Sequence, residues 1–405
     1  MAVEANQEWL KSNGDPHLVL VHRLPSFSFQ LNDILQPHFR LLDPVDSPEP
    51  ACSFLSNHAQ SVRALICVAN TPLTAETLNL LPSLELVVAS SAGVDHIDTR
   101  ECRRRGIIMT NASTAFAEDA ADYAVTLLID VWRRISAADR FIHAGLWPVK
   151  GGYPLGSKLN RSGHRYGFVV FRRHSMSITS SSAYKIYGLI LPRCILRNSY
   201  GVRLAPRLLV HSDILLVISL SLLASFGLHG CLGGKRVGIV GLGSIGSEVS
   251  KRLEAFGCSI AYSSRKEKPR VPYPYYTNVL ELAAHSDALV LCCSLSEHTR
   301  HIINKDVMTA LGKTGVIINV GRGGLVDEKE LVQFLLRGDI GGAGLDVFEN
   351  EPDVPRELFE LDNVVLSPHH AIFTSESVEA VHQLIFTNLK AFFSNKPLQS
   401  VYQFE

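Results

Sequence analysis

The chain has 405 residues, with 39 basic and 39 acidic residues and 46% hydrophobic residues. This composition suits a globular protein of two or three domains with sizeable cores, and the zero net charge gives no electrostatic reason to expect nucleic-acid binding. The sequence shows no secretory leader and no peroxisomal tripeptide, and its eight cysteines form neither a C-x-x-C pair nor a zinc-binding spacing. We therefore expect a cytosolic protein that holds no metal.

Residues 17–111 alternate short β-rich runs with helical stretches, which predicts a parallel α/β sheet. The expected strands are 18–22, 39–42, 64–68, 86–90 and 107–110. Ligands of such sheets bind at the carboxyl ends of the strands, and one such end carries Ser91, Ala92, Gly93 and Val94. Their backbone N–H groups would suit a substrate carboxylate, although an ordinary turn before a helix is an equally good interpretation.

Residues 117–145 are predicted to form one long helix, because apolar positions recur on one face and no proline interrupts them. Glu118 and Asp119 fall in its first turn, where the helix dipole favours negative charge. We interpret this helix as the crossover between two domains and as a candidate subunit contact. Trp147 follows its end as an exposed aromatic residue.

Residues 160–232 differ from the rest, being rich in arginine and serine with a single acidic residue, Asp213. The apolar run 208–228 has about the length of a membrane span, but His211 and Asp213 interrupt it, so this signal is weak. We expect no membrane association and interpret 160–232 as an atypical, poorly ordered insertion, such as the translation of an unspliced intron.

Residues 235–265 read as a strand, a glycine turn, a helix and a second strand. Gly241 suits a sharp turn, Gly243 lets the backbone approach a pyrophosphate, and Gly246 lets the helix pack against the strand. The helix begins near Ser244 and would offer free N–H donors to the phosphates. Its apolar face is predicted to consist of Ile245, Val249, Leu253 and Phe256. A dinucleotide is the natural ligand, and a glycine-rich turn between packed elements is the alternative.

The end of the second strand indicates which dinucleotide binds. NAD sites usually carry an acidic residue there, which accepts hydrogen bonds from the ribose hydroxyls. This chain has Ser263, Ser264, Arg265 and Lys266 instead. Hydroxyls and cations suit a 2′-phosphate, so we expect NADPH to be preferred and NADH to be usable. The alternative is that the two cations belong to a solvated strand end.

Later strands are expected at 288–293, 315–320, 341–345 and 364–366, and a last helix at 375–393 is expected to return to the first domain. Arg322, Glu351 and His369 follow three of these strands. Together they would suit reduction of a 2-oxo acid. The guanidinium would orient and polarise the substrate, the imidazole would protonate the carbonyl oxygen, and the carboxylate would hold the imidazole. Each has a plainer alternative, since arginines near glycine turns often cap carbonyls and a histidine after proline is often a loop residue.

Four motifs in order, V-G-I-V-G-L-G-S-I-G, N-V-G-R-G-G-L-V-D, G-G-A-G-L-D-V-F-E-N-E-P and S-P-H-H, resemble those of the D-isomer-specific 2-hydroxyacid dehydrogenases. Within this family the plant NADPH-dependent hydroxypyruvate and glyoxylate reductases are the nearest match. The resemblance implies that Arg322 binds substrate, that His369 is the acid/base and that Glu351 is its partner. It places the substrate carboxylate at residues 91–94 and the nicotinamide carboxamide at Asp346. Further cofactor contacts are implied at Leu242, Ser294, Leu295, Thr299, Val320 and Gly321.

The fold implied is α/β, with two flavodoxin- and Rossmann-like domains, parallel sheets and an active-site cleft between them. The substrate domain would comprise 1–116 and 375–405, and the dinucleotide-binding domain 117–159 and 233–374. A homodimer is implied, with Trp147 near the partner's active site. One departure from the family is the run Ala371, Ile372 and Phe373 after the histidines, whose bulk would narrow the pocket. His370 adjoins the expected catalyst, and the preceding proline favours His369.

The resulting functional hypothesis is NADPH-dependent reduction of hydroxypyruvate and glyoxylate to D-glycerate and glycolate by hydride transfer. One rival is an NAD-linked dehydrogenase of another D-2-hydroxy acid. The other is a co-repressor-like protein that senses a dinucleotide and binds a partner.

Overall fold

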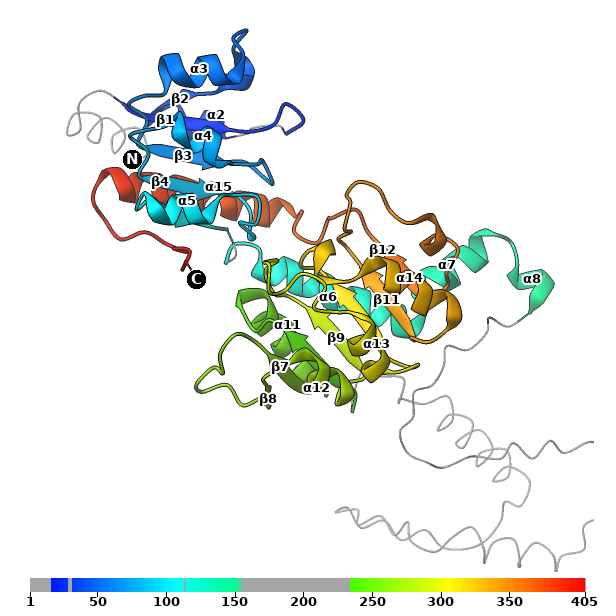
Figure 1. The fold of residues 1–405 in the computed structure, drawn as a ribbon. Coiled ribbons are helices and arrows are strands. Elements are labelled where there is room, and N and C mark those ends of the chain that lie inside the picture. The colour runs from blue at the N-terminus through cyan, green and yellow to red at the C-terminus, as the bar shows by residue number, and fades with distance from the viewer. Residues whose placement is uncertain (1–15, 28–30, 113, 152, 154–233, 405) are drawn as a thin grey trace, which may run out of the picture. The chain divides into compact units, whose positions relative to one another are not determined.

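Two parallel sheets organise the part of the chain that the computed structural model describes, which is residues 16–27, 31–112, 114–151, 153 and 234–404 (Figure 1). The described residues belong to one compact unit. The expected insertion at 160–232 and the apolar run inside it lie outside the described residues. Among the described helices, none combines the length and apolarity that a membrane crossing needs.

The first sheet has five strands in the order β2-β1-β3-β4-β5, all paired in parallel. Each strand was predicted to within one residue of its observed ends. The strands are β1 (His17–His22), β2 (Phe39–Leu42), β3 (Ala64–Cys67), β4 (Leu86–Ala89) and β5 (Ile108–Thr110). The connecting helices are α2 (Asn32–Leu35), η1 (Pro44–Asp46), α3 (Ala51–His58), α4 (Ala75–Asn79) and α5 (Thr99–Arg104).

The second sheet has seven parallel strands in the order β12-β11-β10-β9-β6-β7-β8. Counted along the chain from β6, this is the doubly wound order of a dinucleotide-binding sheet with one extra strand. The strands are β6 (Arg236–Val240), β7 (Ser259–Ser263), β8 (Tyr275–Tyr276), β9 (Ala288–Leu291), β10 (Val316–Asn319), β11 (Gly342–Leu345) and β12 (Val364–Leu366). The two-residue strand β8 was not predicted. The α/β fold class with parallel sheets is confirmed.

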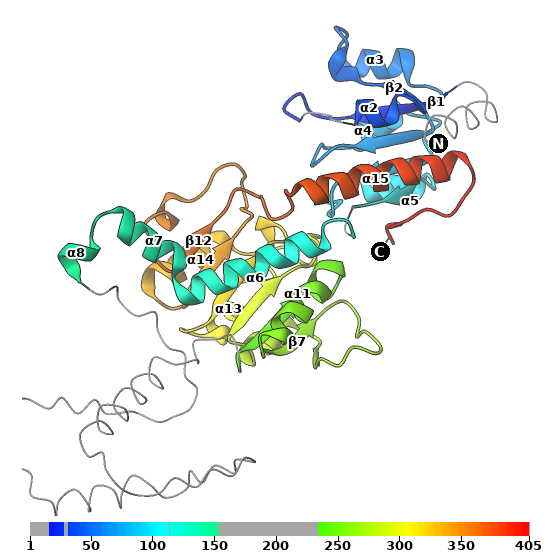
Figure 2. The same ribbon diagram turned by 180° about the vertical axis from the view of Figure 1, so that it is seen from behind.

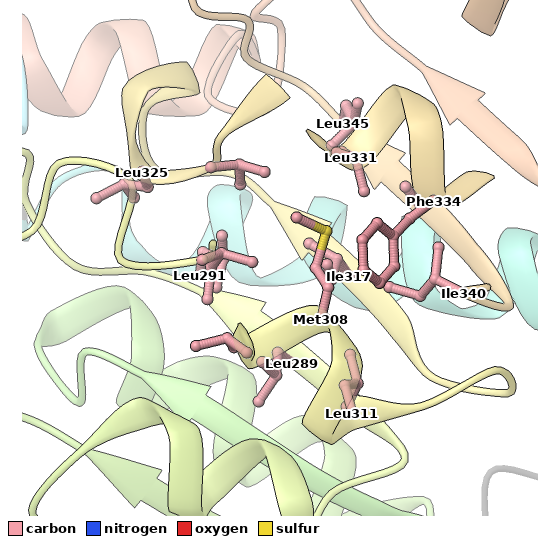
Figure 3. Close-up of a cluster of buried hydrophobic side chains, with 14 of the residues drawn as sticks. Leu289, Leu291, Met308, Leu311, Ile317, Leu325, Leu331, Phe334, Ile340 and Leu345 are labelled. Carbon is pink, nitrogen blue, oxygen red and sulfur yellow. The ribbon is translucent and has the colours of Figure 1, made fainter. Parts of the chain in front are cut away.

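Alternation along the central strands gives this sheet two buried faces. On β9, Leu289 and Leu291 face one cluster while Ala288 and Val290 face the other. Figure 3 shows the first cluster, which α12 (Val279–Ala284), α13 (Lys305–Leu311) and α14 (Glu328–Arg337) cover. The opposite face is covered by α6 (Ala117–Arg133) and α11 (Ser244–Ala255), which pack against each other (Figure 2).

The last helix, α15 (Ser375–Phe393), has the predicted bounds and packs on the first sheet. Val381, Ile385 and Leu389 on one of its faces join strand residues Val19, Ala64, Ile66, Leu86 and Val88 in a buried cluster. Thr374 forms its N-cap and accepts a hydrogen bond from the Ser377 backbone N–H at 3.0 Å. The chain therefore leaves the first sheet after β5 and returns to it at its C-terminal helix.

The predicted single helix at 117–145 is wrong. It divides at Arg134, which takes a left-handed φ of 52°, into α6 and α7 (Ile135–His143), and the short α8 (Trp147–Lys150) follows. The Asp130 carboxylate accepts hydrogen bonds from the Ser136 backbone N–H, at 2.8 Å, and from the Ser136 hydroxyl. These local side-chain bonds compete with helix continuation, so the break follows from Asp130 and Ser136 rather than from a proline.

Candidate active site

The glycine motif lies where the strand order of the second sheet reverses, between β6 and β9. Gly241 has a φ of 95°, and a Cβ on it would lie 2.5 Å from the Cys293 nitrogen after β9. A Cβ on Gly246 would collide with the Gly241 carbonyl oxygen, whereas a Cβ on Gly243 would meet nothing within 4 Å. Gly241 and Gly246 are thus required by the fold itself. Gly243 faces open space at the N-terminus of α11, which is a suitable cradle for a pyrophosphate.

This difference separates cofactor binding from folding. We expect Gly243→Ala to leave the free energy of unfolding nearly unchanged, because its φ of −86° is open to alanine. The new methyl group should weaken dinucleotide binding at least about 10-fold, or about 1.4 kcal/mol. Gly246→Ala should instead destabilise the fold by roughly 2 kcal/mol or more through overpacking. Thermal unfolding and fluorescence titration with NADPH measure the two effects, and equal affinity in wild type and Gly243→Ala would contradict this role.

The residues predicted to form the apolar face of α11, the helix after the glycine turn, lie in or against the core with one exception. Leu242, Val249 and Leu253 are buried in the core, and Ile245 packs against it. The prediction that Phe256 shares this apolar face is wrong, because α11 ends at Ala255 and Phe256 is 47% exposed as the residue after it. Ser244 is the first residue of α11.

The residues expected at the ribose follow β7. Ser263 is buried and its carbonyl accepts the Gly241 N–H at 2.8 Å, which joins the end of β7 to the glycine turn. The Ser264 hydroxyl donates to the Lys266 carbonyl at 2.6 Å and shapes the turn. Arg265 and Lys266 are exposed on that turn. The turn that carries the expected hydrogen-bond donors to a 2′-phosphate therefore begins beside the glycine loop.

The remaining predicted cofactor residues follow β9 and β10. Ser294 is exposed and its carbonyl accepts the Thr299 hydroxyl at 2.8 Å, so this pair forms a closed turn with Leu295 inside it. Val320 is buried, and the Gly321 N–H donates to the Asn319 side chain at 3.1 Å. Both segments lie at the carboxyl edge of the sheet, where doubly wound folds bind their ligands.

Arg322 is brought onto the predicted substrate loop. A Cβ on Gly93 would lie 2.9 Å from the Arg322 Cζ atom, so the guanidinium lies directly over that glycine. Its Nε donates to Asp95 Oδ1 at 3.1 Å and its Nη1 to the Gly321 carbonyl at 3.0 Å. The Asn319 side chain also donates to the Arg322 carbonyl at 2.9 Å. The guanidinium is thus held from both sheets, with its plane fixed by two acceptors.

The substrate loop itself is held by local bonds. Ser91 is buried, and its hydroxyl donates to the Gly93 carbonyl at 2.7 Å. The Asn111 side chain donates to the Ala92 carbonyl at 2.9 Å, and Val94 is buried in the core. Because the Ala92 and Gly93 carbonyls already accept these hydrogen bonds, the loop is held in one conformation beneath Arg322.

His369 and Glu351 form the predicted pair. His369 Nδ1 lies 2.8 Å from Glu351 Oε2, and the other carboxylate oxygen accepts the Phe348 N–H at 3.0 Å. Burial alone would raise the pKa of Glu351. The hydrogen bonds from His369 and Phe348 and the nearby positive charge of Arg322 outweigh burial and lower that pKa below its ordinary value. Glu351 therefore stays ionised beside the imidazole.

Asp346 holds the loop that carries His369. Its buried carboxylate accepts the Ser367 hydroxyl at 2.5 Å and the backbone N–H groups of His370, at 2.7 Å, and Ala371, at 2.9 Å. Its carbonyl accepts the His369 N–H at 2.7 Å. These bonds fix His369 in a left-handed φ of 54°. The observed role of Asp346 is thus to shape the histidine loop, and its contact with a nicotinamide stays a prediction.

The bulky run after the histidines is split between core and surface. Ala371 is buried and Ile372 packs against the first-sheet core, whereas Phe373 is 58% exposed. The His370 ring lies against Phe373, with 5.0 Å between centroids. Of the two neighbouring histidines, His369 is therefore the one that meets the carboxylate.

Sequence reasoning assigned no role to Asp95 or Asn319, although Asn319 begins a quoted motif and Asp95 directly follows the predicted substrate loop 91–94. Their polar side chains at strand ends were the available signal. His96, next to Asp95, also stands out, since burial lowers its pKa to about 4 and leaves its imidazole neutral at physiological pH. Trp147 is 61% exposed. Within the described residues, no group of three or more metal-binding side chains gathers.

Comparison with known proteins gives consistent matches. Residues 226–371 match the family described as D-isomer specific 2-hydroxyacid dehydrogenase, NAD binding domain. The chain is 46% identical to glyoxylate/hydroxypyruvate reductase HPR3 of Arabidopsis thaliana over 98% of this chain and 100% of that protein. It is 38% identical to hydroxyphenylpyruvate reductase of Plectranthus scutellarioides over 85% and 87% of the two chains.

Solved structures agree with this. The fold matches an NADPH-dependent glyoxylate/hydroxypyruvate reductase from Sinorhizobium meliloti, solved with NADP and malonate. The TM-score is 0.70 and the identity 28%, with 96% of this chain and 97% of that chain covered.

Proposed function

This chain belongs to the D-isomer-specific 2-hydroxyacid dehydrogenase family, and we propose that it reduces hydroxypyruvate and glyoxylate with NADPH, yielding D-glycerate and glycolate. The observation that carries the proposal is the position of the Arg322 guanidinium over Gly93, with its positive charge close enough to lower the pKa of Glu351, the partner of His369. A grip for a carboxylate and a proton donor thus share one site. The likeness to the Arabidopsis and Sinorhizobium reductases supports the same substrates.

The residues divide the reaction between them. Arg322 binds the substrate carboxylate and polarises the carbonyl oxygen through its fork of donors. The bound cofactor supplies the hydride to the carbonyl carbon. His369 donates a proton from Nε2 to the carbonyl oxygen, because Glu351 occupies Nδ1 and fixes which nitrogen faces the substrate. Asp95 keeps the guanidinium in place through its Nε.

The direct test is a steady-state comparison of NADPH and NADH with hydroxypyruvate and with glyoxylate. We expect the highest kcat/KM with NADPH and one of these two acids. Hydroxyphenylpyruvate serves as a third substrate, because a relative is named for it. The proposal would be wrong if none of the three acids supported oxidation of NADPH or NADH.

The cofactor preference rests on the turn after β7. Ser263→Asp places a carboxylate beside the Gly241 turn, where it would repel a 2′-phosphate and accept hydrogen bonds from an unmodified ribose. We expect the ratio of kcat/KM for NADPH to that for NADH to fall about 100-fold, which two close negative charges readily supply. Arg265→Ala should reduce the same ratio less, by weakening NADPH alone. An unchanged ratio in both variants would show that the cations are not the determinant.

We also propose a homodimer in the cytosol. Large apolar side chains are exposed in sequence over α7 and α8, with exposed fractions of 53% for Ile135, 48% for Ile142, 61% for Trp147 and 80% for Val149. A second copy covering this segment would remove them from water. Analytical ultracentrifugation of wild type and Ile142→Asp distinguishes a dimer through this segment from a monomer, and a fluorescent fusion reports the compartment.

A further inference from the structure

A second imidazole–carboxylate pair lies beside the catalytic one. His301 Nε2 is 2.8 Å from Glu349 Oε1, just as His369 Nδ1 is 2.8 Å from Glu351 Oε2. The two glutamates are separated only by Asn350. Both histidines take positive φ values, 51° for His301 and 54° for His369. Such backbone conformations cost energy in residues other than glycine and persist only where the surroundings enforce them.

The peptide that joins Phe348 to Glu349 is fixed from several sides. A Cβ on Gly323, the residue after Arg322, would collide with this peptide, so the two backbones are in direct contact. The Glu349 N–H donates to the Glu328 carboxylate at 3.1 Å, and the Phe348 N–H donates to Glu351 at 3.0 Å. The segment 348–351 therefore links the arginine loop to the catalytic carboxylate.

Three carboxylates crowd this segment. Burial raises the pKa of Glu328, the Glu349 N–H opposes that rise, and the negative charges of Glu349 and Glu351 add to it. The side chains that face Glu349 are the imidazole of His301, at 2.8 Å, and the positively charged guanidinium of Arg300, at 3.2 Å. The Glu349 side chain is only 16% exposed, so solvent screens it poorly. Without these donors, Glu349 would be repelled by its neighbours.

His301 also ties this segment to the turn after β9, where we propose that the nucleotide binds. It follows the turn closed by Thr299 and Ser294, and its N–H donates to the Gly324 carbonyl at 2.8 Å. Its backbone is thus fixed to the loop after Arg322 while its ring reaches Glu349. One residue spans the arginine loop and the segment that carries Glu351.

We propose that His301 and Glu349 are positioning residues, which hold the segment 348–351 so that Glu351 stays within hydrogen-bond reach of His369. This inference rests on the proposed reductase function, and it adds residues that do not touch the substrate. When the His301–Glu349 contact is lost, Glu351 moves away and His369 loses the carboxylate that favours its protonated form. The reaction needs that proton, so as pH rises activity should begin to fall at a lower pH than in wild type.

The test uses two substitutions of His301 that affect its contact with Glu349 differently. His301→Asn keeps a residue that tolerates positive φ but is too short to reach Glu349, whereas His301→Gln places an amide donor near the position of Nε2. We expect kcat for hydroxypyruvate to fall roughly 10- to 100-fold in His301→Asn. KM for hydroxypyruvate and for NADPH should stay within about 3-fold, and the alkaline limb of the pH profile should move to lower pH. His301→Gln should recover most of the wild-type kcat. The kcat of Glu349→Gln should lie between those of His301→Asn and His301→Gln.

The matched control is His285→Asn. His285 is an exposed histidine whose ring bonds a carbonyl of its own helix, so its loss should change neither kcat nor the pH profile. Thermal unfolding checks that every variant is folded. Equal losses in His301→Asn and His301→Gln, or a loss confined to KM for NADPH with a fixed alkaline limb, would overturn the positioning role.

A second readout does not depend on turnover. Titration of the His369 ring by NMR should give a lower pKa in His301→Asn than in wild type, and the wild-type value in His285→Asn. If wild type reduces no 2-oxo acid, the proposed function fails while this titration still decides the positioning role. An unchanged His369 titration in His301→Asn counts against positioning even if wild type is an active reductase.

Discussion

Arg322→Ala is expected to lower kcat/KM for hydroxypyruvate by about 10³- to 10⁴-fold, or about 4 to 5.5 kcal/mol of transition-state stabilisation. The substitution removes both the partner of the substrate carboxylate and the donor to the developing oxyanion. Asp95, whose carboxylate now receives the guanidinium Nε at 3.1 Å, would add its negative charge against the substrate. Arg322→Lys should recover little, because one ammonium group cannot fork onto two oxygens.

Steady-state kinetics with folded protein check this, and Arg337→Ala on the exposed side of α14 is the control. NADPH affinity should remain near wild type, since the arginine serves the acid and not the dinucleotide. Retained turnover in Arg322→Ala would show that Arg322 does not bind the substrate carboxylate as proposed. The same experiment separates an enzyme from a dinucleotide-sensing binding protein, because a sensor would keep its function without this residue's chemistry.

His369→Asn should lower kcat by about 10²- to 10⁴-fold with little change in KM, because general acid catalysis contributes that range. Asparagine is chosen because it tolerates the φ of 54° found at this position, so the loop should keep its form. The carboxylate of Asp346 binds the next two backbone N–H groups and would hold the loop in either case.

Glu351→Gln separates the charge of the partner from its hydrogen bond. The amide can still accept from Nδ1 of His369, but it cannot favour the imidazolium. The pKa of His369 should fall, and the alkaline limb of the pH profile for reduction should move to lower pH. In wild type the pKa of Glu351 is lowered, so its carboxylate should stay ionised at neutral pH and take up a proton only in acid. A pH profile identical to wild type in Glu351→Gln would refute this assignment.

Much of the architecture could be read from local patterns. The five strands of the first sheet, the start of α11 at Ser244 and both ends of α15 follow from apolar periodicity and turn residues. The break at Arg134 could not be found this way, because the bonds between Asp130 and Ser136 that cause it leave the apolar pattern of α6 and α7 intact. Phe256 was misplaced for a related reason, since the helix ends one residue before it.

The sequence by itself determined the types of chemistry present. These are a glycine turn suited to phosphate, and an arginine, a carboxylate and a histidine that each follow a predicted strand of one sheet. Only the tertiary structure decided which groups meet. Arg322 pairs with Asp95 across 227 positions, His301 pairs with Glu349 across 48, and Asp346 turns out to bind the histidine loop. The physical reason is that periodicity and turn chemistry act over a few residues, whereas charge pairing and buried hydrogen bonding depend on distances that the packed sheets alone fix.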